Sequence, residues 1–92
     1  MIETDKIKKL KEGLYDLLKS VDFLSMAFLY GMEHNMEYPM RESRNTFNEI
    51  LNIFNDTVKI IEINGGTISP SAIKAMEAAD ELFNKTLKHT EI

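Results

Sequence analysis

The stretch Val21–Met32, VDFLSMAFLYGM, is the most apolar run of the chain and decides which fold the rest can adopt. It closes a series of apolar residues whose steps alternate between three and four: Ile7, Leu10, Leu14, Leu17, Val21, Leu24 and Phe28. This spacing is typical of a helix that packs along a seam against a neighbour. We therefore expect one long helix over residues 5–35.

The side of this helix opposite the seam changes its character after Lys19. Up to that point it is charged, with Lys8, Glu12 and Asp16. Beyond it the same side is apolar and carries Phe23, Met26, Ala27 and Tyr30. A helix that is apolar all round lies at the centre of a bundle or is shared with a partner. A membrane span is not expected, because a span needs roughly twenty apolar residues and this run is shorter and contains Asp22.

Gly31 falls on the seam of the same helix and allows two interpretations. The missing side chain lets another backbone approach closely, or the helix bends there. A bend at Gly31, with the segment Met32–Met40 folded over the apolar side, would cover that side without a partner.

Two shorter helices follow. Pro39 suits a first turn and predicts a helix over residues 40–64, which Asn64-Gly65-Gly66 ends. Ser69-Pro70 then starts a helix over residues 70–89, with serine as the cap and proline in the first turn. Short connections make consecutive helices antiparallel neighbours. The expected fold is all-α, with a single domain over residues 1–92 in an up-down-up arrangement.

The expected helices differ in length, at about 42 Å for the first against about 34 Å and about 28 Å for the others. Together with the apolar outer side, this mismatch favours a homodimer or a higher oligomer. The residues expected to self-associate lie on the outer side and its edge: Phe23, Leu24, Met26, Ala27 and Tyr30.

Composition narrows the function classes. The chain has no cysteine, which excludes disulfides, zinc ribbons and thiol catalysis. Its net charge of −4 argues against nucleic acid as a partner, because phosphate contacts need a clustered positive surface. The first residues, MIETDKIKKLKEG, lack the apolar core of a secretory signal, so a cytoplasmic location is expected.

The connector between the first two helices holds both arginines and one of the two histidines. Arg41 and Arg44 are three residues apart near a helix start, a geometry that suits phosphate or carboxylate. One interpretation is a binding site for a small anionic, nucleotide-like ligand at an oligomer interface, built from Arg41, Arg44, His34 and Tyr38. The other is that the arginines pair on the surface with nearby glutamates.

Neither metal binding nor catalysis is expected. Carboxylate-bridged metal bundles use paired Glu-x-x-His motifs, whereas this chain has a single His-x-x-Glu at His34 and Glu37. The acidic residues that catalysis would require read as outward helix positions: Asp56, Glu62, Asp80 and Glu81. The sequence therefore predicts no cofactor and no enzymatic activity.

In size, acidity and helical pattern the chain resembles bacteriocin-immunity bundles and small phage-encoded inhibitors of host proteins. That resemblance implies a regulator that acts by binding another protein. From the residues themselves, the expected function is a non-enzymatic interaction module that self-associates and presents a surface to another macromolecule.

Overall fold

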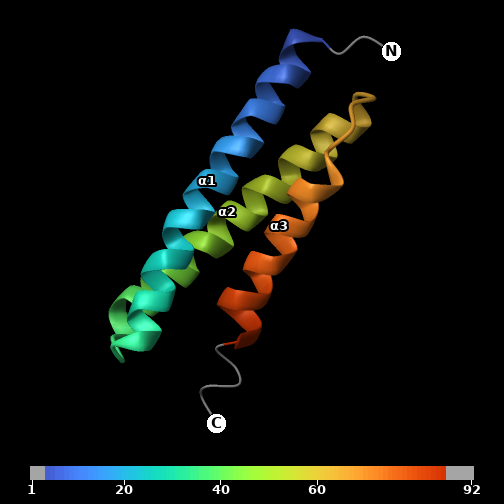
Figure 1. Cartoon of the computed structure of the whole chain (residues 1–92). Helices are drawn as coiled ribbons and strands as arrows, with labels where there is room; N and C mark the ends of the chain where they lie inside the picture. Colours follow the sequence, from blue (N-terminus) through green and yellow to red (C-terminus); the bar gives the residue numbers. More distant parts are fainter. Residues whose placement is uncertain (1–3, 87–92) are drawn as a thin grey trace.

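The structure, a computed structural model, describes residues 4–86 of the 92 as a rod of 50 × 19 × 18 Å. Three helices lie along the rod: α1 (Asp5–Glu33), α2 (Glu37–Ile63) and α3 (Pro70–Asp80). A π-helical turn, η1 (Glu81–Thr86), continues α3. The helices run antiparallel in sequence order (Figure 1), which confirms the all-α, up-down-up fold.

The core follows a seven-residue repeat on α1 and α2. The buried side chains of α1 are Ile7, Leu14, Val21 and Phe28, and those of α2 include Phe47, Phe54 and Ile61. The leucines at the intermediate positions of α1, Leu10, Leu17 and Leu24, are half-buried and pack against this core. The repeat thus aligns one continuous row on each helix, as knobs-into-holes packing requires.

The helix ends carry the predicted stop and start signals. The Thr4 hydroxyl accepts a hydrogen bond from the Ile7 amide at 3.3 Å and caps α1. After α2, Gly65 has φ 83°, a left-handed conformation that glycine adopts without strain. Pro70 occupies the first turn of α3, although the Ser69 hydroxyl contacts Ser71 Oγ at 2.7 Å instead of capping the helix.

Gly31 lies inside a continuous helix, so the bend that would have covered the apolar side of α1 is absent. A Cβ at this position would lie 2.7 Å from Met40 Cγ and 3.0 Å from the Met36 carbonyl oxygen. The chain reverses just beyond, where Asn35 has φ 54°. Glycine is therefore needed here for the close approach of α2, and the connector packs on the seam rather than on the outer side.

The predicted start of α2 was wrong by three residues, since the helix begins at Glu37 and not at residue 40. Pro39 lies within the first turn, where backbone amides have no intrahelical acceptor to lose. The earlier start makes α1 and α2 nearly equal, with 29 and 27 residues. The length mismatch between these two helices is therefore much smaller than expected.

The third helix also differs from its prediction, because regular α-helix ends at Asp80 and η1 follows. In η1, Phe83 is buried and stacks on Phe47, with ring centroids 4.5 Å apart, and its centroid is 4.9 Å from that of Phe28. The predicted residues 87–89 of this helix lie outside the described part of the chain.

A polar contact joins η1 to α2. The side-chain amides of Asn48 and Asn84 bond to each other at 3.0 and 3.4 Å, and Asn84 Nδ2 also donates to Asp80 Oδ1 at 2.7 Å. Asp80 is half-buried, so its prediction as an outward residue was wrong. These bonds keep the polar groups satisfied at the edge of an aromatic cluster.

Candidate interaction surface

The outer side of α1 exposes large apolar side chains. Phe23 is 75% exposed, Met26 68% and Tyr30 54%, and Ala27 beside them is also exposed. We call these four residues the α1 outer patch. They follow the spacing i, i+3, i+4 and i+7, which places them together along one side of the helix. Of the five residues predicted to self-associate, only Leu24 lies elsewhere, half-buried at the seam.

The patch is exposed because the core occupies the opposite side of the same helix. Val21 and Phe28 point into the bundle. Phe23 lies two residues after Val21 and Met26 two residues before Phe28, which is about half a turn in each case, so both point out. Neither α3 nor the connector reaches that side, since α3 packs over Leu18 and Ser25 and the connector packs on Gly31. Within residues 4–86, no other segment therefore covers Phe23.

Charged and aromatic groups flank the patch at both ends. Toward the N-terminal end, Lys19 Nζ lies 4.0 Å from a carboxylate oxygen of Asp16. Toward the C-terminal end, Glu33 is exposed and the ring of His34 lies 4.2 Å from that of Tyr30. The N-terminal end thus carries an ion pair of Lys19 with Asp16, and the C-terminal end carries the carboxylate of Glu33.

The four residues predicted to hold an anionic ligand fall into separate local contacts. Arg41 pairs with Glu37 at 3.6 Å, and its guanidinium lies 6.0 Å from the centroid of the Tyr38 ring. The ring of His34 contacts that of Tyr30 at an interplanar angle of 45°, and Arg44 is half-buried on α2. Because α2 begins at Glu37, both arginines lie beyond its first turn. Anion binding by these residues stays a prediction.

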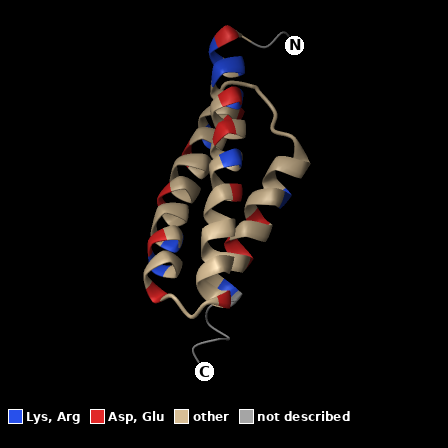
Figure 2. Ribbon diagram, turned by 60° about the vertical axis from the view of Figure 1, so that its left-hand side comes forward, with Lys and Arg blue, Asp and Glu red and all other residues tan. Residues whose placement is uncertain are grey.

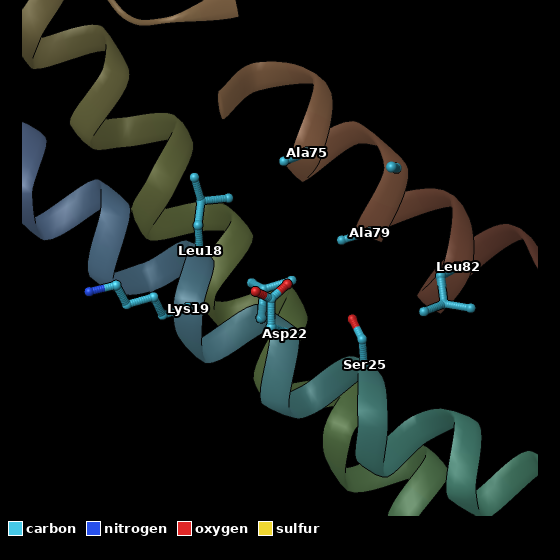
Figure 3. A pocket seen from close by; sticks show the side chains of 9 residues that line it. Leu18, Lys19, Asp22, Ser25, Ala75, Ala79 and Leu82 are labelled. Atoms are coloured by element: carbon cyan, nitrogen blue, oxygen red, sulfur yellow. The ribbon is translucent and has the colours of Figure 1, made fainter. Parts of the chain in front are cut away.

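A hollow of about 370 Å³ between α1 and α3 was not predicted from the sequence. Three alanines of α3, including Ala75 and Ala79, and Leu82 of η1 form one wall, and Asp22 and Ser25 of α1 line the facing wall (Figure 3). The hollow arises because alanines keep α3 close to α1 without filling the space between them. No local sequence signal marks it, since Asp22 and Ser25 look like ordinary surface residues.

Charge is distributed unevenly along the rod. Lysines gather in the first turns of α1, whereas acidic and basic residues are interspersed along the remaining helices (Figure 2). Within residues 4–86, no group of three or more histidine or acidic side chains is placed to hold a metal ion. None of the helices in this part of the chain has a stretch that is long and apolar enough to cross a membrane.

Comparisons with protein families, with curated proteins and with solved structures found no match to this chain.

Proposed function

We propose that the protein is a non-enzymatic helical interaction module that self-associates through the α1 outer patch. The exposure of Phe23, Met26 and Tyr30 carries this proposal. Burying such side chains stabilises an assembly by about 25 cal/mol for each Å² of apolar surface removed from water. Clusters of this kind on a protein surface commonly mark interaction sites.

A second copy of the chain is the occupant that the patch fits best. Two α1 helices packed antiparallel, with the two-fold axis between Met26 and Ala27, bring Phe23 of each copy opposite Tyr30 of the other. The same arrangement places Lys19 opposite His34 of the second copy. The patch is therefore complementary to itself in its apolar contacts.

The experiment compares the mass of the native protein with that of two variants by light scattering over a range of concentrations. We expect the unmodified chain to form a dimer or larger assembly. Phe23→Asp should raise its dissociation constant by at least about tenfold, because losing a hot-spot side chain costs about 2 kcal/mol or more and a tenfold change corresponds to about 1.4 kcal/mol.

Ile53→Asp is the matched control, because it also replaces an exposed apolar side chain by a carboxylate, on α2 instead of α1. The assembly of this variant should contain as many chains as that of the unmodified protein. A monomeric native protein, or an assembly that Phe23→Asp leaves intact, would show that the patch is not a self-association surface.

A further inference from the structure

A second exposed strip runs along α2. Its residues follow steps of four and three and are all exposed: Glu42, Thr46, Glu49, Ile53, Asp56 and Ile60. We call them the α2 strip. Ile53 is 53% exposed and Ile60 46%, although both are large and apolar. The strip therefore alternates unburied isoleucine with carboxylate along one side of a helix.

The α2 strip lies on the side of α2 away from α3. Leu51 and Asn55 line the boundary with α3, and a helix turns by about 100° per residue. Ile53, two residues from each, must therefore point away from that boundary. It also stands about 100° from the buried Phe54, so neither the core nor α3 covers it.

The carboxylates of the strip are free within residues 4–86. Glu42, Glu49 and Asp56 take part in none of the ion pairs or side-chain hydrogen bonds found there. Carboxylates in such a position repel a partner of like charge and attract one of opposite charge. The missing counter-charges are therefore expected on whatever binds the strip.

The same strip on a second copy of the chain does not supply these charges. Because Glu42, Glu49 and Asp56 repeat every seven residues, pairing two strips antiparallel with this repeat in register sets carboxylate against carboxylate. Shifting the register to avoid this contact sets Glu49 against Ile53 and places a charge on an apolar side chain. The α2 strip thus differs from the α1 outer patch, which is complementary to itself.

We propose that the α2 strip docks an amphipathic helix of another protein that carries lysine or arginine beside its apolar face. The isoleucines receive the apolar side chains of that helix, and the carboxylates pair with its flanking cations. This is the helix-on-helix mode of recognition, in which apolar anchors recur at three- and four-residue steps. The charges select the partner and its orientation.

The test uses two synthetic helical peptides as probes. Both have leucine at the first and fourth positions of each heptad; one has lysine beside the leucines and the other glutamate. Titration calorimetry should detect binding of the lysine peptide only. The affinity should fall between ionic strengths of about 0.05 and 0.5 M, because salt screens exposed charges.

Two double variants with the same change in net charge locate the binding. E49K/D56K reverses the charge at two positions of the strip. It should lower the affinity for the lysine peptide by at least about tenfold and allow the glutamate peptide to bind. E12K/E62K places the same charges on α1 and near the end of α2, and should leave affinity for the lysine peptide within about twofold. The double variant Ile53→Ser, Ile60→Ser should also lower the affinity for the lysine peptide.

Equal losses in the two charge variants would overturn the proposal, because the peptide would then be responding to net charge alone. Failure of the native protein to bind the lysine peptide would overturn it as well. Circular dichroism of each variant separates these results from a loss of fold.

Discussion

The two sides of α1 between Val21 and Gly31 are both apolar, yet one is buried and the other is exposed. Phe28, on the inner side, is fully buried against Phe83, whereas Phe23, on the outer side, is 75% exposed. Gly31 is needed on the inner side because α2 passes against it. The difference shows that apolar character identifies a helix surface that can be buried, while the neighbouring elements decide whether it is buried.

Replacing each phenylalanine by alanine tests this difference in burial most directly. Phe28→Ala should lower the free energy of unfolding by about 3–5 kcal/mol, because it leaves a cavity among close-packed aromatic rings. Phe23→Ala should change it by less than about 0.5 kcal/mol in a solution dilute enough to dissociate any assembly. Urea denaturation followed by circular dichroism measures both values, and similar losses would contradict the assigned exposures.

Gly31→Ala tests the close approach on the inner side and should have a smaller effect. The new Cβ would lie 2.7 Å from Met40 Cγ and 3.0 Å from a backbone oxygen, so the connector must shift. We expect the free energy of unfolding to fall by about 1–3 kcal/mol, the usual cost of overpacking. A stabilised variant in the same denaturation experiment would mean that α2 does not approach Gly31 as described.

Gly13→Ala is the counterpart on an exposed part of the same helix. Apart from the adjacent residues and the nearby backbone of α1, no atom lies within 4 Å of the position that its Cβ would occupy, so the substitution meets no obstacle. It should raise the free energy of unfolding by up to about 1 kcal/mol, because alanine favours the helix more than glycine does. Measured beside Gly31→Ala, it should give a shift of opposite sign in the denaturation midpoint.

The two proposed surfaces extend the comparison from one helix to the whole molecule. The α1 outer patch can meet its own copy because its apolar side chains come opposite one another in an antiparallel pair. The α2 strip cannot, because it repeats one charge. Phe23→Asp should therefore change the mass of the assembly without changing binding of the lysine peptide, and E49K/D56K should do the reverse.

Much of the fold followed from local residue patterns. The seam on α1, the stop at Asn64-Gly65-Gly66 and the start at Pro70 each rest on contacts within a few residues. The second apolar side of α1 followed for the same reason, since helical spacing alone separates Phe23 from the seam. The start of α2 was missed because a proline fits several places in a first turn.

The remaining features depend on residues that are far apart in the chain. The turn η1 forms where Phe83 reaches Phe47 and Phe28, and where Asn84 reaches Asn48. The hollow beside Asp22 exists only because the alanines of α3 face it. Neither had a signal in its own stretch of sequence.

By itself the sequence determined that this chain forms antiparallel helices and which side of each helix is apolar, because both depend on spacing along one helix. Only the tertiary structure decided which apolar sides remain uncovered. Packing determines that α3 covers Leu18 and Leu51 but not Ile53, and that the connector meets Gly31 and leaves Phe23 exposed. Burial is a property of pairs of surfaces, so it is settled only when the helices are brought together.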